Sequence, residues 1–349
     1  MTEDDRRARA VTEAVAERRD LVNAAIDEDL PLAHPERLYE ASRYLLEAGG
    51  KRLRPAVVLL VAEALSDVEP LSEDYRRFPT LSGEEIDLLK AAVSIEVIQS
   101  FTLIHDDIMD DDDLRRGVPA VHRAYDLETA ILAGDTLYSK AFEIMLGTGA
   151  PPERAIRAIE ALATTCTKIC EGQALDVSFE GREDVGISEY MEMIELKTAV
   201  LYGAAASVPG IVLGADDETV SALCGYGLDV GRAFQIQDDV LDLTVASDRL
   251  GKQRGSDLVE GKRTLITLHA TDQGVDVDGL VDAGSVETVT EADIDRAVAE
   301  LEAAGSIDFA RERASSLVER GKARLEVVPE NEPRDLLCDL ADYLIERGY

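Results

Sequence analysis

The sequence contains no tryptophan, few aromatic residues of any kind and only four cysteines. Aromatic residues make up 5% of the 349 residues and hydrophobic residues 46%, so a core has to be built mainly from aliphatic side chains. This hydrophobic share excludes a wholly disordered chain. The cysteines lack paired CxxC spacing and nearby histidines, which argues against a zinc site and favours a reduced, cytoplasmic protein.

Lysine is scarce as well, with eight lysines against twenty-eight arginines. The 71 acidic residues outnumber the 36 basic ones, are spread along the chain and give a formal net charge of −35. Because no basic stripe offsets this field, binding to nucleic acid or to anionic membranes is excluded as a general function. The pattern is typical of a halophilic protein that stays soluble in a salt-rich cytoplasm, where ions screen its self-repulsion.

Long hydrophobic runs are also missing. The longest markedly apolar stretch, Ala56 to Ala64, already contains Glu63 and is too short to cross a bilayer. The N-terminal segment MTEDDRRARAVTEAV is charged and lacks the hydrophobic region of a signal peptide. We therefore expect a soluble protein without stable membrane insertion.

Apolar residues recur at helical spacing through almost every segment, and strand-like alternation is rare, which predicts an all-α protein. Glycine and proline separate the helices, for example at Pro209-Gly210, and no break resembles a long flexible linker. One domain spanning residues 1–349, with a central cavity, is the simplest organisation. The helices are expected at residues 5–29, 35–48, 54–66, 84–109, 126–147, 152–178, 188–208, 216–243, 262–271, 290–304, 306–325 and 332–347.

One short acidic pattern occurs twice, as DDIMD at Asp106 to Asp110 and as DDVLD at Asp238 to Asp242. On a helix, positions i and i+4 share a face, so each copy directs two or three carboxylates to one place. In so acidic a chain a single copy is most simply solvated surface. Both copies follow mainly apolar runs, however, and buried carboxylates need partners or metals. The pair therefore predicts a site for Mg²⁺ and a diphosphate.

Four of the rare lysines lie beside glycine turns or acidic motifs: Lys51 in GGKRLRP, Lys197 in ELKTAVLYG, and Lys252 and Lys262 in GKQRGSDLVEGKRT. A compact ammonium group suits a diphosphate oxygen. For Lys252, simple capping of a helix end stays an alternative interpretation.

Arginines accompany these lysines. GGKRLRP presents Lys51, Arg52 and Arg54 within four residues, an arrangement that favours an anion site in an acidic protein. Arg115 and Arg116 follow the first acidic pattern within a turn or two, where their guanidinium groups can bind phosphate oxygens. A surface cluster of salt bridges is the alternative for this pair.

Taken together, the motifs resemble those of the trans-prenyltransferases, the isoprenyl diphosphate synthases. GGKRLRP, DDIMDDDDLRRG, GQALD, LKT, FQIQDDVLD and GKQRGSDLVEGKRT occur in that family's order and cover about residues 35–270. The resemblance implies an all-α, isoprenoid-synthase-type helical bundle around a deep central cavity, usually in a homodimer. It also implies that the two aspartate motifs face each other across the mouth of that cavity.

The resemblance assigns roles residue by residue. Mg²⁺, expected as three ions with substrate bound, would be held by six aspartates: Asp106, Asp107, Asp110, Asp238, Asp239 and Asp242. The allylic diphosphate would be bound by Arg115, Lys197, Thr198, Gln235, Lys252 and Lys262. Isopentenyl diphosphate would be bound by Lys51, Arg54 and Arg116, with Gln99 where many relatives have histidine. The expected catalytic residues are Asp106, Asp110, Lys197 and Asp238.

The implied reaction is the Mg²⁺-dependent head-to-tail condensation of isopentenyl diphosphate with an allylic diphosphate. Phe101, five positions before Asp106, and the smaller Thr102 resemble an archaeal geranylgeranyl-type arrangement that limits product length. Geranylgeranyl diphosphate is therefore the predicted product. The alternatives are a farnesyl or longer-chain synthase and a non-catalytic partner subunit of a heteromeric synthase. A terpene cyclase or a squalene/phytoene-type synthase is disfavoured by GGKRLRP and by DDVLD.

Overall fold

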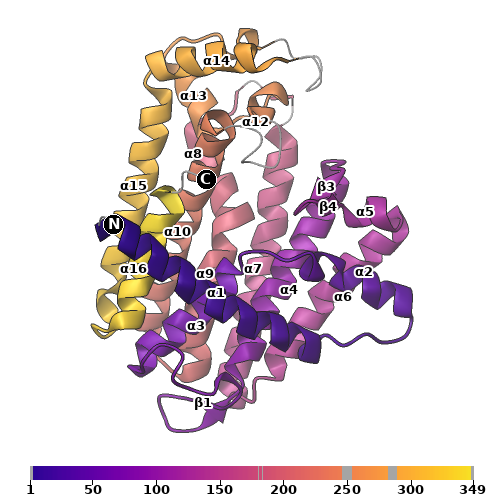
Figure 1. The fold of residues 1–349 in the computed structure, drawn as a ribbon, viewed down its shortest axis with the longest axis vertical. Helices are drawn as coiled ribbons and strands as arrows, with labels where there is room; N and C mark the ends of the chain where they lie inside the picture. Colours follow the sequence, from indigo (N-terminus) through magenta and orange to yellow (C-terminus); the bar gives the residue numbers. More distant parts are fainter. Residues whose placement is uncertain (1–2, 180, 183, 246–253, 282–288, 347–349) are drawn as a thin grey trace. The chain divides into compact units, whose positions relative to one another are not determined.

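The computed structural model describes residues 3–179, 181–182, 184–245, 254–281 and 289–346, and it confirms an all-α protein (Figure 1). Two antiparallel pairs of two-residue strands interrupt the helices, β1 (Phe78–Pro79) with β2 (Glu85–Ile86) and β3 (Leu114–Arg115) with β4 (Val118–Pro119). The main helices are α1 (Glu3–Asp29), α2 (Glu36–Glu47), α3 (Leu53–Ser66), α4 (Leu88–Met109), α5 (Val121–Ala124), α6 (Leu127–Leu146), α7 (Pro152–Phe179), α8 (Ile187–Ile194), α9 (Val200–Leu213), α10 (Asp217–Thr244), α12 (Ser256–Val259), α13 (Leu265–Asp272), α14 (Glu291–Ala303), α15 (Ser306–Arg324) and α16 (Glu332–Glu346).

The chain divides into two compact units. Unit 1 comprises residues 1–166, 203–224 and 325–339, and unit 2 comprises residues 167–202, 225–324 and 340–349. Helices α7, α9, α10 and α16 contribute residues to both units. A single domain over residues 1–349 stays a prediction.

Two predicted boundaries differ from the structure. Helix α4 begins at Leu88 rather than at residue 84, because the side chain of Asp87 caps it by accepting a hydrogen bond from the Lys90 backbone N–H (3.2 Å). The predicted break at Pro209-Gly210 lies inside α9. This helix is buried along most of its length, and the burial of its apolar residues offsets the missing proline hydrogen bond.

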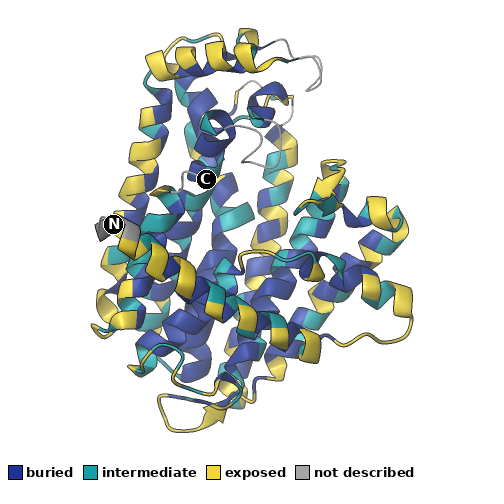
Figure 2. Cartoon of the chain, viewed as in Figure 1, coloured by how far each residue is buried: buried dark blue, intermediate teal, exposed yellow. Residues whose placement is uncertain are grey.

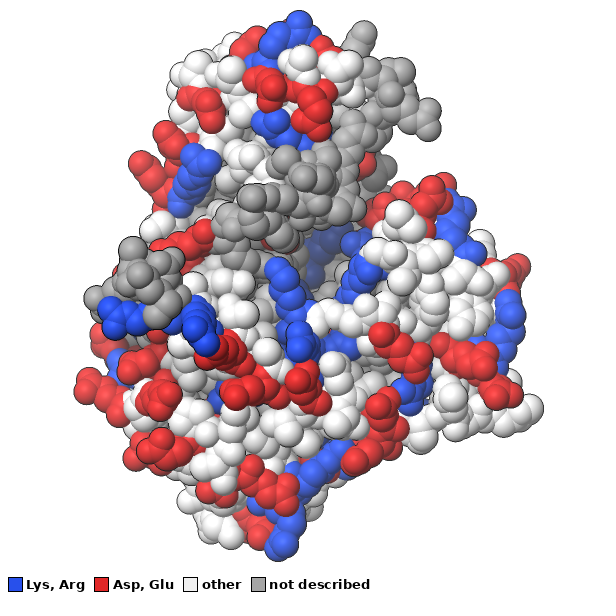
Figure 3. Space-filling model, in the orientation of Figure 1, with Lys and Arg blue, Asp and Glu red and all other residues white. Residues whose placement is uncertain are grey.

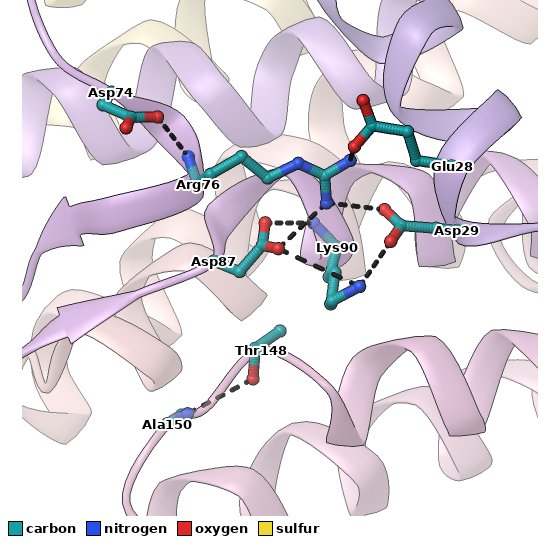
Figure 4. Close-up of polar contacts among 8 residues, drawn as sticks. All are labelled: Glu28, Asp29, Asp74, Arg76, Asp87, Lys90, Thr148 and Ala150. Atoms are coloured by element: carbon teal, nitrogen blue, oxygen red, sulfur yellow. Dashed lines mark hydrogen bonds and ion pairs between the residues drawn. The ribbon is translucent and has the colours of Figure 1, made fainter.

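A charged cluster in unit 1 connects the start of α4 to α1 (Figure 4). Arg76 donates hydrogen bonds to Asp29 (2.8 Å) and Asp87 (2.9 Å), and it also pairs with Glu28. Lys90 forms an ion pair with the same Asp29. The cluster therefore joins the end of α1, the loop before β1 and the first turn of α4, the helix that carries the first acidic motif.

The core of unit 1 contains a buried ion pair between α1 and α3. Helix α3 is buried at every position from Pro55 to Ala64, including the carboxylate of Glu63. Arg18 of α1, which is also buried, donates to Glu63 Oε2 (2.5 Å) and to the carbonyl of Ala14 (2.9 Å). The Tyr75 hydroxyl donates to Glu63 Oε1, and burial followed by the charge of Glu63 raises the pKa of this tyrosine. Glu63 is thus held by groups from two other segments.

In unit 2, α15 is exposed along one side and buried along the other (Figure 2). Its buried residues recur every three or four positions: Ser306, Ile307, Ala310, Ala314, Leu317, Val318 and Gly321. The buried side chain of Asp229 in α10 accepts hydrogen bonds from Arg320 (2.5 and 2.9 Å) and Arg324 (2.9 Å) of α15. Apolar packing and this charge pair together hold α15 against α10.

Two segments are long and apolar enough to cross a membrane by length and composition alone, Leu88–Met109 and Ile187–Leu213. Their most apolar windows are 72% and 83% buried inside the protein, as in the core helices of a soluble protein. The sequence-based expectation had considered only the shorter run at residues 56–64. The absence of membrane insertion stays a prediction.

Acidic side chains are scattered over the whole face shown in Figure 3 rather than gathered in one place. This distribution agrees with the even spread of the acidic excess along the sequence. Ionic strength is expected to screen repulsion between such separated surface charges.

Replacing Glu63 by alanine should destabilise the protein by about 3–5 kcal/mol, because it leaves the buried guanidinium of Arg18 without its carboxylate. Denaturant unfolding in concentrated salt would measure the effect. Glu13→Ala is the matched control, since it removes the exposed carboxylate that pairs with Arg9 on the same helix and should leave stability unchanged. Equal stability of the two variants would contradict the importance of the buried pair.

Candidate functional site

The first acidic motif forms the end of α4 in unit 1. Asp107 is fully buried and accepts a hydrogen bond from Arg115 Nε on Oδ1 (2.6 Å), whereas its Oδ2 is buried with no hydrogen-bond partner in the described structure. Burial raises the pKa of Asp107 to about 6, although Arg115 opposes the shift. Asp106 is half-buried and Asp110, the C-cap of the helix, is exposed. The three carboxylates therefore differ in environment, and fully buried Asp107 is only partly compensated, by Arg115.

The two arginines of the hairpin formed by β3 and β4 contact different partners. Arg115 binds Asp107 and also Asp112 (2.8 Å). Arg116, whose φ of 56° is left-handed, instead donates to the carbonyls of Leu45 (2.9 Å) and Gly49 at the end of α2. The structure thus places Arg115 at the first acidic motif and Arg116 at the GGKRLRP turn, and their assignment to two different substrates stays a prediction.

GGKRLRP does not present all of its cations to solvent. Arg52 also has a left-handed φ of 51°, and its side chain points into unit 1, where Nη1 donates to Glu96 (2.6 Å) and Nε to Asn23 (3.0 Å). Lys51 is exposed and Arg54 half-buried. The prediction of three neighbouring anion-binding cations was therefore wrong for Arg52, because its guanidinium neutralises a buried carboxylate.

Glu96 is a residue that the sequence interpretation missed. It is buried in α4, binds Arg52 and lies 3.4 Å from Arg116 Nη2, so one carboxylate joins the two arginines. Gln99, the predicted isopentenyl diphosphate contact, follows one turn later on α4 and is half-buried. The available signal was a single glutamate inside the apolar run VSIEVIQSF.

The two predicted chain-length residues lie on the same helix. The buried ring of Phe101 makes edge-to-face contacts with His105 (6.0 Å between centroids) and with Tyr138 of α6 (5.3 Å). Thr102 is half-buried and donates its hydroxyl proton to the Gln99 carbonyl (2.8 Å). Phe101 is thus packed between α4 and α6, and its predicted role in product length stays a prediction.

The second acidic motif lies in α10 of unit 2. Asp239 is buried and accepts hydrogen bonds from the Tyr190 hydroxyl (2.5 Å) and from Gln235 (3.1 Å). Burial, and then the charge of Asp257, raises its pKa to about 8 despite these bonds. Asp242 is buried too and accepts a hydrogen bond from the Ser256 hydroxyl (2.9 Å), whereas Asp238 is half-buried.

The LKT motif occupies an irregular helix turn that the sequence did not reveal. Residues Glu195–Ala199 form a π-helix between α8 and α9. In this turn Lys197 Nζ donates to Asp176 of the GQALD motif (2.6 Å), and the Thr198 hydroxyl donates to Gln235 (2.9 Å). Four predicted motifs of unit 2, GQALD, LKT, FQIQ and DDVLD, are therefore linked through side-chain contacts. π-Turns are frequent at functional sites.

Two further predicted lysines follow α10. Lys262 is half-exposed and pairs with Glu260 (3.0 Å) and Asp257 (3.6 Å). Lys252 lies outside the described residues. The described residues contain no preformed cluster of three or more histidine, cysteine or acidic side chains that could hold a metal ion.

The donors nevertheless fit a hard divalent cation. Both motifs offer carboxylate oxygens, the ligands that Mg²⁺ prefers, and in each motif one buried carboxylate has a raised pKa that a nearby positive charge would lower. Asp106, Asp110 and Asp238 are the more accessible aspartates, whereas Asp107, Asp239 and Asp242 are buried against protein partners. The assignment of all six as metal ligands stays a prediction.

The raised pKa of Asp239 predicts a pH effect in protein freed of divalent ions. Between pH 3.8, the ordinary pKa of an aspartate, and about pH 8, folded Asp239 keeps a proton that the unfolded chain releases, so the contribution of this residue to stability falls as pH rises. Asp239→Asn mimics the protonated form and should gain stability relative to the parent from pH 5 to pH 8, by at most about 1.4 kcal/mol per pH unit. Unfolding curves at several pH values with a chelator would measure it, and parallel pH profiles would contradict it.

The chain is similar to known proteins along almost its whole length. The family model described as polyprenyl synthetase matches residues 35–301. A geranylfarnesyl diphosphate synthase of Natronomonas pharaonis is 72% identical over 97% of this chain and 98% of its own length. The solved structure of a geranylgeranyl pyrophosphate synthetase from Geoglobus acetivorans has a TM-score of 0.84 at 45% identity, covering 95% of this chain and 99% of that one.

A more distant crystal structure bears on the ligands. It is a geranylgeranyl pyrophosphate synthase from Corynebacterium glutamicum complexed with isoprenyl diphosphate and magnesium, with a TM-score of 0.77 at 28% identity and coverage of 99% and 100%. The chain belongs to the polyprenyl synthetase family, the trans-isoprenyl diphosphate synthases, and is a prenyltransferase.

Proposed function

We propose that this prenyl diphosphate synthase condenses isopentenyl diphosphate with allylic diphosphates and depends on Mg²⁺. The observation that carries the proposal is the burial of Asp107 and Asp239 with raised pKa values, one in each acidic motif. Such carboxylates favour a cation beside them. The relative from Corynebacterium glutamicum, whose structure holds magnesium and isoprenyl diphosphate, supports the same metal here, with three ions as the predicted number.

The residues around the second motif would bind and orient the allylic diphosphate. Lys197 supplies an ammonium group, and Thr198 and Gln235, which are hydrogen-bonded to each other, supply further polar groups. Arg115, beside the first motif, Lys262 and Lys252 are the remaining proposed contacts of this diphosphate. Mg²⁺, when bound by the aspartates, would neutralise the charge that develops on the departing diphosphate.

A second set of residues would hold isopentenyl diphosphate with its double bond directed at the allylic carbon. Lys51, Arg54 and Arg116 are its proposed anion contacts, with Gln99 as a hydrogen-bond donor. Glu96 and Arg52 stabilise the turn from inside, since Glu96 contacts both Arg52 and Arg116. Because these cations are held in place before substrate binds, less side-chain conformational entropy is lost on binding.

Product length has two candidates. Geranylgeranyl diphosphate is the prediction from Phe101 and Thr102, and a relative from Geoglobus acetivorans carries that name. Geranylfarnesyl diphosphate, one isoprene unit longer, is supported by the relative from Natronomonas pharaonis, which is 72% identical along almost the whole chain. We favour the longer product because that identity is much higher, and because a longer chain was among the alternatives left open by the sequence.

A homodimer in a salt-rich cytoplasm is the proposed working state. Helix α6 exposes large apolar side chains, which a second copy of this chain would cover: Leu127, Ile131, Leu132, Tyr138 and Leu146. The net charge of −35 supports adaptation to concentrated salt. No stable membrane insertion is proposed, since the two long apolar helices are mostly buried.

Asp106→Asn and Asp238→Asn should each lower kcat by orders of magnitude, because each removes a charged oxygen ligand from a bound cation while leaving the helices intact. Steady-state assays with isopentenyl diphosphate and each allylic starter in high salt would measure this, with circular dichroism to check folding. Near-normal turnover in either variant, or full activity after exhaustive chelation, would refute the metal site.

Phe101→Ser should shift the products to longer chains, since it removes the ring that would limit the growing prenyl tail. Thr102→Phe should shorten the products towards farnesyl diphosphate, because it adds bulk next to the same place. Sizing the extracted products by chromatography gives the readout, and Tyr138→Phe, which keeps the contacting ring, is the control. An unchanged distribution in active variants would show that Phe101 is only part of the core.

A further inference from the structure

The π-helix at Glu195–Ala199 lies between α7 and α10 of unit 2, and it contacts both helices. Towards α7, Lys197 binds Asp176, and its backbone lies against Gly172, which is four residues earlier on the same face. Towards α10, the Thr198 hydroxyl binds Gln235, and the backbone of Ala199 lies against Gly231, again four residues earlier. On each side a glycine is paired with a side-chain partner one turn away.

Gly172 allows a backbone contact that no other residue could make. A Cβ atom at this position would lie 2.2 Å from the Lys197 backbone nitrogen and 2.6 Å from the carbonyl carbon of Leu196. Both contacts are far below van der Waals separation, and both are with main-chain atoms of the π-turn rather than with a flexible side chain. An alanine here would therefore force the turn itself to move.

Gly231 makes the same kind of contact from α10. A Cβ atom there would lie 2.6 Å from Ala199 Cα and 2.9 Å from its Cβ. The next residue, Arg232, forms an ion pair with Glu195, the first residue of the π-helix. The π-turn is thus contacted at its start by Arg232, in the middle by Gly172 and at its end by Gly231.

A π-turn contains one residue more than an α-turn and is less stable in isolation, so neighbouring contacts have to maintain it. If it reverted to α-helical geometry, the register would change by one residue and the side chains on one side would rotate by about 100°. Lys197 and Thr198 could not then both keep their contacts with Asp176 and Gln235.

We propose that Gly172 and Gly231 are positioning residues that clamp the π-turn from both sides and so aim Lys197 and Thr198 at the allylic diphosphate. The proposal rests on the proposed function for the role of Lys197 and Thr198. It assigns the two glycines, together with the pair of Glu195 and Arg232, a role in substrate affinity and not only in packing.

The test compares Gly172→Ala and Gly231→Ala with Gly225→Ala. A Cβ at Gly225, also in α10, would meet the flexible side chain of Arg324 at 2.7 Å, so this control should adapt without moving the π-turn. Helix propensity alone favours alanine at all three positions. If Gly172 and Gly231 hold the π-turn in place, KM for the allylic diphosphate should rise at least about tenfold in the first two variants. KM for isopentenyl diphosphate should stay within about twofold of the parent.

Lys197→Ala separates this proposal from the assignment of the site. If Lys197→Ala leaves KM for the allylic substrate unchanged, the proposed role of the lysine fails, and the clamp is then judged by whether a crystal structure of Gly172→Ala shows an α-turn in place of the π-turn. If Lys197→Ala weakens allylic binding and the glycine variants do not, the clamp is refuted.

Glu195→Gln covers the case in which the glycine variants do not fold. It keeps the shape of the side chain, removes the ion pair with Arg232, and should raise KM for the allylic substrate about threefold. If the glycine variants fail to fold and Glu195→Gln behaves as the parent towards both substrates, the contacts serve packing alone and the proposal is overturned.

Discussion

Buried carboxylates are the constraint on which this structure depends. A charged oxygen inside a protein needs a cation or several hydrogen bonds, and the cost of leaving it without them is several kcal/mol, about as large as the stability of many domains. Glu63 meets this need with Arg18 and Tyr75, Glu96 with Arg52, and Asp229 with Arg320. Asp107 and Asp239 meet it only in part, as their raised pKa values indicate. The two carboxylates whose charge is only partly compensated, Asp107 and Asp239, are therefore those of the acidic motifs.

Several residues of the candidate site have an irregular backbone conformation. Arg52 and Arg116 have left-handed φ angles of 51° and 56°, which direct their side chains to Glu96 and to the end of α2. Lys197 and Thr198 lie in a π-turn. Non-glycine residues in left-handed conformations and π-turns cost free energy and persist where surrounding contacts maintain them. In each case a buried partner or a close backbone contact provides that support, so these side chains are held in one orientation by the protein itself.

Much of the fold followed from the sequence. Helical periodicity and glycine or proline breaks located the helices to within a few residues, because amphipathic spacing and capping are local properties. The errors have physical reasons. Because Asp87 caps α4, the helix begins at Leu88, later than the apolar pattern of the sequence suggests. Burial of the apolar residues of α9 keeps Pro209 inside that helix. The motifs located the candidate site, but they did not reveal that Arg52 points inward to Glu96. That contact joins residues 44 positions apart.

The sequence by itself determined the all-α class, the family and the residue types that can bind Mg²⁺ and diphosphates, since these depend on composition, spacing and motif order along one chain. Only the tertiary structure decided which cation of GGKRLRP pairs with a buried carboxylate. Arg52 and Arg54 are chemically equivalent in the sequence and differ only in their surroundings. The π-turn at Lys197 depends in the same way on Gly172 and Gly231, which approach it from two other helices, and close packing between distant segments is not encoded in any local pattern.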